Sequence, residues 1–192
     1  MKSKVIIGID EAGRGPLAGP LVVAAVAGID AKDLRGIRDS KRLTKLGRER
    51  WYRFLRQKGL CRFASVSPHA IDCNGIVPST RKAVGRLLSR LSKNYKQKTT
   101  NCSILLDGSL FAPKTYKNQR TVIRGDERIP IIAAASIIAK VTRDRKMMKM
   151  HIQYPLYGFE RHKGYGTRAH FAAIRTHGLS DIHRRSFCTR IF

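Results

Sequence analysis

The sequence is poor in acidic residues, and this shortage narrows the classes of partner that the chain can have. Asp and Glu total 13 against 39 Lys and Arg, which gives a formal net charge of +26 at pH 7. The basic residues are spread along the whole chain, and no long basic amphipathic stretch suggests a membrane surface. A positive field of this strength attracts polyanions, so nucleic acid is the expected partner.

Paired cysteines and long apolar runs are also missing. Cys61, Cys73, Cys102 and Cys188 show no C-x-x-C spacing, which argues against a zinc site and a disulfide framework and favours a reducing compartment. The longest apolar stretches fall short of the roughly 20 residues that a membrane span needs. Acidic residues interrupt the first apolar run, which excludes a signal-peptide core. We therefore expect a cytoplasmic protein.

The pattern of apolar residues predicts an α/β fold. Short runs rich in Val and Ile predict strands at 5–10, 21–29, 61–67, 102–106 and 120–124. Helical periodicity and capping residues predict helices at 44–58, 79–91, 130–150 and 168–176, with loops at 93–100 and 154–167. The length of 192 residues fits one domain, a central mixed sheet flanked by helices, with a short C-terminal helical extension over about 167–192.

The few acidic residues recur where predicted strands end. Asp10 and Glu11 close the first strand, and Asp107 and Asp126 each follow a later one. If these ends meet at one rim of the sheet, the repulsion among the carboxylates requires hard divalent cations, so Mg²⁺ or Mn²⁺ is the expected cofactor. Two such ions can hydrolyse a phosphodiester. The spacing alone leaves a second interpretation open, because Asp beside Gly at a strand end is more often a turn residue.

Longer motifs sharpen this interpretation. The segment GIDEAGRGPLAGP at 8–20 strongly resembles the N-terminal signature of the ribonuclease HII family. The resemblance continues, over nearly the whole chain, through DSK at 39–41, DG at 107–108, GD at 125–126, IAAASIIAKVTRD at 132–144, HKGYGT at 162–167 and HRRSF at 183–187.

The resemblance implies a ribonuclease H-like fold and a two-metal endoribonuclease. Such an enzyme hydrolyses the RNA strand of RNA/DNA hybrids and nicks DNA duplexes 5′ of embedded ribonucleotides, leaving 3′-hydroxyl and 5′-phosphate ends. By position, the catalytic and metal-binding carboxylates are Asp10, Glu11, Asp107 and Asp126. We expect a monomer that serves ribonucleotide excision during DNA replication and repair.

The fourth carboxylate has a competitor within the same motifs. Asp144 also belongs to the matched pattern, but it falls one turn after Lys140 on a predicted helix, a spacing typical of a surface ion pair. Asp126 is preferred because it falls at a strand-to-helix junction near the other strand ends.

The resemblance also implies a turn that recognises the ribonucleotide. Gly13, Arg14 and Gly15 are expected to read its 2′-hydroxyl, since glycines let a sugar and phosphate approach the backbone closely. A plain connecting turn is the alternative. Contact with the 2′-hydroxyl is the physical means of distinguishing RNA from DNA.

Four further side chains are candidate substrate contacts. Tyr165 lies between two glycines, and the resemblance implies that it packs at the DNA side of the junction. Lys41, Lys163 and Arg185 fall in matched motifs and are candidate phosphate contacts. A single basic residue in so basic a chain is more often solvated surface, which is the competing interpretation.

Two rival functions remain at this point. A non-catalytic nucleic-acid-binding protein would suit the charge equally well, but it would not need four placed carboxylates. The related ribonuclease HIII family shares the acidic site but is not expected to carry GRGP at 13–16 in this form. The clustered histidines near the C-terminus lack metal-ligand spacing and are expected to be polar surface or hydrogen-bonded residues.

Overall fold

A five-stranded mixed sheet forms the centre of the computed structural model, which describes residues 5–37, 40, 43–94 and 102–191. Its strands lie in the order β3-β2-β1-β4-β5. β1 is antiparallel to β2 and parallel to β4. The strands are β1 (Ile6–Ala12), β2 (Leu21–Ala27), β3 (Leu60–Val66), β4 (Ser103–Asp107) and β5 (Gln119–Val122). The predicted α/β fold, a central mixed sheet flanked by helices, is confirmed.

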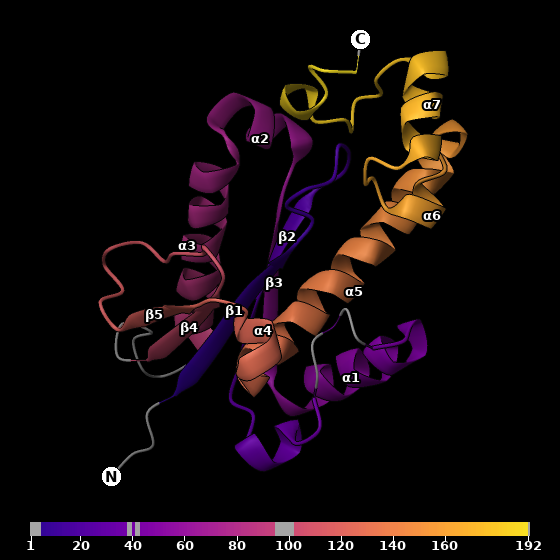
Figure 1. Cartoon of the computed structure of the whole chain (residues 1–192). Coiled ribbons are helices and arrows are strands. Elements are labelled where there is room, and N and C mark those ends of the chain that lie inside the picture. The colour runs from indigo at the N-terminus through magenta and orange to yellow at the C-terminus, as the bar shows by residue number, and fades with distance from the viewer. Residues whose placement is uncertain (1–4, 38–39, 41–42, 95–101, 192) are drawn as a thin grey trace.

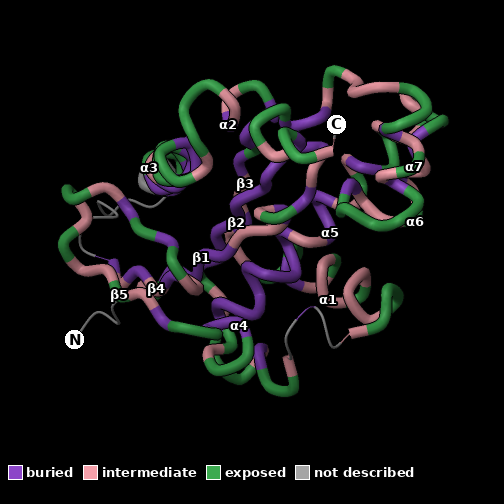
Figure 2. Tube along the Cα trace, turned by 45° about the horizontal axis from the view of Figure 1, so that its top comes forward, coloured by how far each residue is buried: buried purple, intermediate pink, exposed green. Residues whose placement is uncertain are grey.

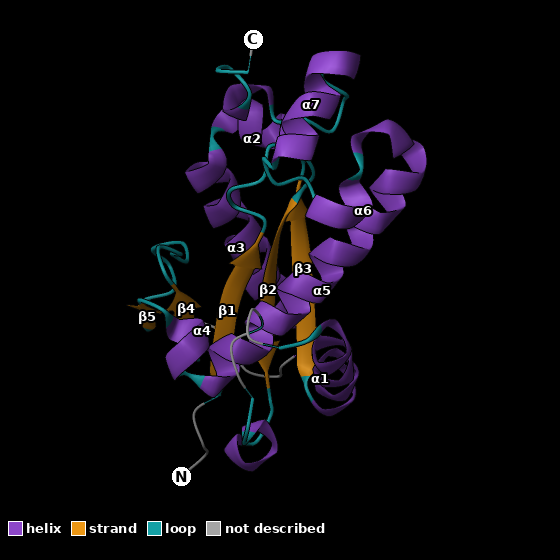
Figure 3. Ribbon diagram, turned by 45° about the vertical axis from the view of Figure 1, so that its right-hand side comes forward, coloured by secondary structure: helices purple, strands orange, loops and turns teal. Residues whose placement is uncertain are grey.

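Helices cover both faces of this sheet, with α2 and α3 on one side and α1 and α5 on the other (Figures 1 and 3). None of the described helices has the length and apolar character that a bilayer span requires. The helices are η1 (Ala31–Leu34), α1 (Lys45–Lys58), α2 (Pro68–Asn74), α3 (Ile76–Asn94), α4 (Gly125–Arg128), α5 (Pro130–Gln153), η3 (Pro155–Tyr157), α6 (Phe159–His162), α7 (Arg168–His177) and η4 (Arg185–Phe187).

Strand β2 is buried on both faces and separates two apolar cores (Figure 2). Val23 and Ala25 point into the core under α3, whereas Ala24 and Val26 point into the core under α5. Alternate side chains of a strand point to opposite faces, so a continuous apolar run is required here.

Helix α5 lies unusually close to β1, and a glycine permits this contact. A Cβ atom at Gly8 would lie 2.2 Å from the carbonyl oxygen of Ile131. This contact fixes the start of α5 against the strand that carries Asp10, and the helix continues beyond the sheet toward the C-terminal segment (Figure 1).

A third apolar cluster joins the far end of α5 to the C-terminal segment and to the loop after β1. It contains Ala18, Met147, Tyr157, Phe159 and Ile174. Backbone hydrogen bonds from Leu17 N to Gly164 O (2.9 Å) and from Gly19 N to Ile182 O (2.8 Å) tie residues 13–20 to the same region. These contacts bring three segments that are distant in sequence to one end of the sheet.

The structure departs from the sequence predictions at two hydroxyl residues, whose side chains can either cap a helix or donate to a backbone carbonyl. Ser79 and Thr80 do not begin a helix at 79. Their hydroxyls donate to the carbonyls of Ala70 and Ile76, and α3 begins at Ile76. The preceding helix α2, capped by Ser67, was not predicted.

Two further departures concern loops. The segment predicted as a loop at 154–167 contains η3 and α6, and Lys93 and Asn94 of the loop predicted at 93–100 belong to α3. Residues 95–100 of that loop lie outside the described residues.

Candidate active site

Three carboxylates meet at one end of the sheet. Asp10 lies near the end of β1, Asp107 ends β4, and Asp126 lies in the first turn of α4. One oxygen of each lies within 4.8 Å of the others. Asp10 and Asp126 are each only 4% exposed. The structure thus brings together three of the four carboxylates that the sequence singled out.

The local structure explains why these side chains meet. In the parallel pairing of β1 with β4, Ile9 lies opposite Leu106, so the next residue of each strand is an aspartate at the same rim. Asp107 Oδ1 accepts hydrogen bonds from the backbone N–H groups of Gly125 (2.6 Å) and Asp126 (3.3 Å). It therefore orients the short helix that carries the third carboxylate.

The cluster is electrostatically costly as it stands. Burial raises the pKa of Asp10 well above its ordinary value, and the charges of Asp107 and Asp126 raise it further. Hydrogen bonds from the backbone of Glu11 (2.6 Å) and from the Ser136 hydroxyl lower the pKa only in part. A positive charge among the carboxylates would offset this cost.

Glu11 stands beside the cluster with one oxygen in use. Its Oε1 accepts a hydrogen bond from Arg14 Nη1 at 2.7 Å, while its buried Oε2 has no hydrogen-bond partner among the described residues. Burial raises the pKa of Glu11, and the contact with Arg14 opposes that shift. A buried, unpartnered carboxylate oxygen beside three convergent ones suits a hard divalent cation, so these residues fit Mg²⁺ or Mn²⁺.

The carboxylates open into a cavity of about 320 Å³. Its walls include the turn of Gly13, Arg14 and Gly15, and also Tyr165, which is 44% exposed. All four of these predicted substrate contacts therefore lie beside the carboxylates. Their roles in binding stay predictions.

Two of the other predicted contacts do not line this cavity. The ammonium of Lys163 donates to the backbone carbonyl of Glu160 and lies 3.4 Å from Met148 Sδ. Arg185 is exposed, and its backbone N–H donates to Asp72 Oδ2 at 2.9 Å. Lys41 lies outside the described residues.

The alternative fourth carboxylate is paired elsewhere. Asp144 Oδ1 accepts from Lys140 Nζ at 3.0 Å, the ion pair that the sequence spacing predicted. The group of convergent carboxylates found among the described residues contains Asp126 and not Asp144.

Besides Ala12, four cavity residues with polar side chains were not selected from the sequence. Ser136, Lys140 and Arg143 lie on one face of α5 and line the cavity. Their spacing of four and then three residues was a usable signal, because it places side chains on one helical stripe. Ser40 also lines the cavity, and its hydroxyl lies 2.9 Å from that of Ser136.

Two of the histidines near the C-terminus lie in the interior of the protein and not on its surface. His170 and His183 are buried, with their Nε2 atoms 3.1 Å apart. This pair therefore takes the hydrogen-bonded alternative of the expectation and not the surface one. Packing against Phe159 supplies the apolar surroundings.

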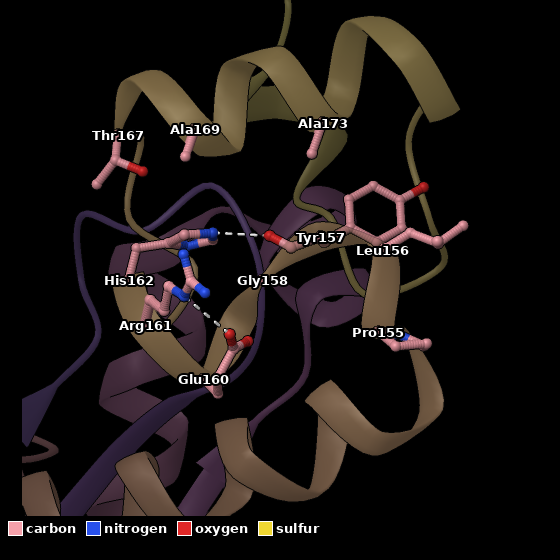
Figure 4. Close-up of a pocket in the computed structure, with 10 residues that line it drawn as sticks. All are labelled: Pro155, Leu156, Tyr157, Gly158, Glu160, Arg161, His162, Thr167, Ala169 and Ala173. Carbon is pink, nitrogen blue, oxygen red and sulfur yellow. Dashed lines mark hydrogen bonds and ion pairs between the residues drawn. The ribbon is translucent and has the colours of Figure 1, made fainter.

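A larger cavity, of about 580 Å³, lies between the η3–α6 segment and α7 (Figure 4). Its polar groups are matched to each other. His162 Nε2 donates to the Tyr157 carbonyl at 2.7 Å, and Glu160 pairs with Arg161 at 3.3 Å. Its walls contain a single carboxylate and no convergent group of them, so the chemistry points to the smaller cavity.

Comparison with known proteins gives a consistent family. The family model described as Ribonuclease HII matches residues 7–190. A ribonuclease HII of Nitrosomonas europaea is 44% identical over 185 residues, covering 96% of this chain and 82% of the relative. One from Sulfurovum sp. is 42% identical over 187 residues, covering 97% and 93%.

Solved structures agree with this result and confirm the predicted ribonuclease H-like fold. The ribonuclease HII of Archaeoglobus fulgidus, solved in complex with PCNA, has 27% identity and a TM-score of 0.77, covering 94% of this chain and 93% of that one. The ribonuclease H2 of Pyrococcus horikoshii has 29% identity and a TM-score of 0.75, with coverage of 97% and 96%. A Bst-RNase HIII solved with Mn²⁺ shares the fold at 19% identity, with a TM-score of 0.68 and coverage of 96% and 65%.

Proposed function

The chain belongs to the ribonuclease HII family and is an endoribonuclease of that type, and from this premise we propose that the cavity at the ends of β1 and β4 is its active site. The observation that carries the proposal is the convergence of Asp10, Asp107 and Asp126, whose oxygens lie within 4.8 Å of one another. Hydrolysis of a phosphodiester by two metals needs such an oxygen-rich site.

Asp10, Glu11, Asp107 and Asp126 are the residues that would hold Mg²⁺ or Mn²⁺. When bound, such ions activate a water for attack and stabilise the charge on the leaving oxygen. The chain's own contribution is to fix the carboxylates before the ions arrive. Asp107 does so by accepting from two backbone N–H groups of α4, and Arg14 does so by holding Glu11 Oε1.

The turn of Gly13, Arg14 and Gly15 would read the ribonucleotide. It forms a wall of the carboxylate cavity, so a 2′-hydroxyl held against its backbone places the adjacent phosphate toward the carboxylates. Tyr165 lines the same cavity and is exposed, which suits packing on the sugar that follows the ribonucleotide.

The remaining parts of the proposal concern partners and setting. The +26 charge supports binding to RNA/DNA hybrids and to DNA duplexes with embedded ribonucleotides. Lys163 and Arg185, which do not line the carboxylate cavity, would contact phosphates. Lys41 is proposed for the same role from its sequence motif. We place the protein in the cytoplasm as a monomer that acts in ribonucleotide excision during replication and repair.

One assay tests the proposal directly. A labelled DNA duplex with a single ribonucleotide is incubated with the protein plus Mg²⁺, plus Mn²⁺, or plus chelator. The expected result is a nick on the 5′ side of the ribonucleotide with either metal and none with chelator. An all-DNA duplex of the same sequence is the control and should stay intact. Cutting in chelator, or of the all-DNA duplex, would contradict the proposal.

A further inference from the structure

Two buried arginines lie behind the turn that forms the cavity wall. Arg143 of α5 is 1% exposed and Arg184 is fully buried. Among the described residues, neither forms an ion pair with a carboxylate. A buried guanidinium is costly unless its N–H groups are hydrogen-bonded, so its partners indicate what it is there to hold.

The partners of Arg184 are backbone carbonyls of the turn and the loop after it. Its Nη2 donates to Gly13 O at 2.7 Å, and its Nη1 donates to Arg14 O at 2.8 Å. Nε and Nη2 both donate to Gly19 O, at 3.1 and 2.9 Å. One rigid fork therefore fixes both ends of the loop that begins with the predicted 2′-hydroxyl reader.

Arg143 holds the same loop through a second set of backbone carbonyls. Its Nε donates to Pro20 O at 3.0 Å, and its Nη2 donates to Lys163 O at 2.9 Å. A Cβ atom at Gly13 would lie 1.9 Å from Arg143 Nε, so the turn rests directly on this guanidinium. Both guanidinium groups therefore hold the loop through its backbone carbonyls.

Arg184 is itself held from outside the cavity. Asp72 of α2 accepts from the backbone N–H groups of Arg185 (2.9 Å) and Ser186 (3.1 Å) and from the Ser186 hydroxyl. These bonds fix the two residues that follow Arg184. Asp72 does not line the carboxylate cavity, so any effect it has there must pass through the C-terminal segment.

We propose that Arg184, together with Arg143, is a positioning residue that sets the Gly13–Gly15 turn for reading the 2′-hydroxyl, and that Asp72 locks Arg184 in place. The proposal rests on the function assigned above to that turn. It makes the C-terminal segment a part of the active site, although it contributes no group to the metal cluster. A turn that must match one hydroxyl needs its backbone held firmly, which a fork on three carbonyls provides.

The test compares Arg184→Lys and Asp72→Asn with Arg190→Lys, an exposed change in the same segment. Lysine keeps the charge of Arg184 but lacks the fork. For Arg184→Lys, we expect kcat on the single-ribonucleotide duplex to fall about tenfold, the scale of one lost charged hydrogen bond. The Kd for all-DNA duplex should stay within about twofold. Asp72→Asn should act in the same direction by about two- to threefold, and Arg190→Lys should do nothing.

Amide hydrogen exchange gives a readout that does not depend on activity. The N–H groups of Leu17, Ala18 and Gly19, bonded across to Gly164 and Ile182, should exchange faster in Arg184→Lys and in Asp72→Asn. Failure of the wild-type protein to cut would overturn the proposed function. Amide exchange would still test whether Arg184 and Asp72 hold the loop after β1.

Three outcomes would overturn the positioning role. One is unchanged kcat in Arg184→Lys, and another is a parallel loss of kcat and all-DNA affinity, which would indicate a core arginine only. The third applies if Arg184→Lys does not fold: kcat and amide exchange in Asp72→Asn are then both the same as in the wild-type protein.

Discussion

The loop after β1 has opposite charges on its two sides, and they are satisfied in opposite ways. In front, three carboxylates share a space of 4.8 Å and repel one another. Behind, Arg143 and Arg184 donate to backbone carbonyls that carry no net charge. The rear is therefore nearly complete as it stands, whereas the front is completed only by a ligand.

In the part of the chain that the structure describes, each side of the loop has one buried polar atom without a partner, and both of these atoms belong to cavity residues. Glu11 Oε2 and Arg143 Nη1 are buried without a hydrogen-bond partner among the described residues, and both of these residues line the cavity. Arg184, which does not line it, has all three of its guanidinium nitrogens in hydrogen bonds. Among the described groups around this loop, the unsatisfied polar atoms therefore belong to residues that line the cavity where substrate or metal is expected.

The strongest way to break the front side is to remove a carboxylate charge. Asp10→Asn or Asp107→Asn should reduce cutting by roughly a thousandfold or more, because each metal contributes several kcal/mol to the reaction. Asparagine preserves size, and at position 107 it preserves an acceptor for the N–H groups of α4. Cleavage and duplex affinity are measured together, and affinity should be nearly unchanged.

Asp126→Asn and Asp144→Asn form a matched pair for the same test. Both keep the side-chain size, but only Asp126 belongs to the convergent group, and Asp144 is paired with Lys140. The first variant should lose far more activity than the second. The reverse ranking would show that Asp144 is the fourth catalytic carboxylate.

Substitutions at two glycines of the turn should differ in their effect on stability, because one glycine faces the buried arginines and the other faces the cavity. Gly13 has φ +92° and would place a Cβ atom 1.9 Å from Arg143 Nε, so Gly13→Ala strains both the backbone and the rear. We expect a loss of about 3–5 kcal/mol. That loss lowers Tm by roughly 10 °C, since a chain of this size shifts about 2–4 °C per kcal/mol.

Gly15 is the control, because nothing lies within 4 Å of a Cβ atom built there. Gly15→Ala should change stability by less than about 0.5 kcal/mol and yet reduce cutting, since its methyl group projects into the space of the substrate. Thermal melts and cleavage rates distinguish the two. Equal Tm values for both variants would remove the distinction between a structural glycine and a substrate-facing one.

Much of the front could be predicted from sequence, and the reason is physical. Scarce acidic residues directly after Val- and Ile-rich runs are conspicuous in a chain of net charge +26, and strand ends gather at one rim. The helix at 44–58 could also be predicted from sequence, because Thr44 is a typical N-cap residue. In the structure its side chain accepts a hydrogen bond from Gly47 N at 3.1 Å.

The rear could not be predicted in the same way. A buried arginine bonded to carbonyls looks like any surface arginine in a basic sequence, and Arg185 was selected where its neighbour Arg184 is the buried one. Only long-range packing separates the two. For the same reason Ser79 was mistaken for a cap, because its acceptor, the carbonyl of Ala70, lies in a helix that the pattern did not predict.

Tyr165 contacts both sides of the loop. Its ring lies 5.7 Å from the Arg143 guanidinium, and it also lines the carboxylate cavity. Tyr165→Ala should lower cutting of a single-ribonucleotide duplex by about tenfold or more, because an aromatic stacking contact contributes roughly 1–3 kcal/mol. Tyr165→Phe keeps the ring and should cost much less. Both are assayed for cutting at saturation and for all-DNA affinity. An equal loss of affinity for both duplexes, with saturated cutting unchanged, would make Tyr165 an ordinary surface contact.

The smallest effect concerns pH and a chain of neutral histidines that supports the rear. Ser180 N–H donates to His183 Nδ1 at 2.9 Å, and His170 Nδ1 lies 2.9 Å from the carbonyl of Tyr165. A carbonyl only accepts, so His170 Nδ1 carries a proton, and His183 Nε2–H then donates to His170 Nε2 across 3.1 Å. A second proton on either ring would set two N–H groups against each other.

Burial lowers the pKa of both rings from 6.5 to about 4, and for His170 the hydrogen bond to the Tyr165 carbonyl only partly opposes this shift. Between pH 6.5 and pH 4 the unfolded chain therefore binds more protons than the folded one. This contribution to stability is complete above pH 6.5 and is lost as the pH falls toward 4.

At pH 5.5, roughly 1–3 kcal/mol should be lost relative to pH 7.5. Asp10 responds in the opposite sense, because its raised pKa makes acidification favourable, so the melts are best run in the Asp10→Asn background. His183→Gln keeps a donor and an acceptor but cannot titrate, and it should flatten the dependence of Tm on pH. If the slope stays the same in His183→Gln, the acid sensitivity arises elsewhere, and the neutral histidine chain does not stabilise the loop.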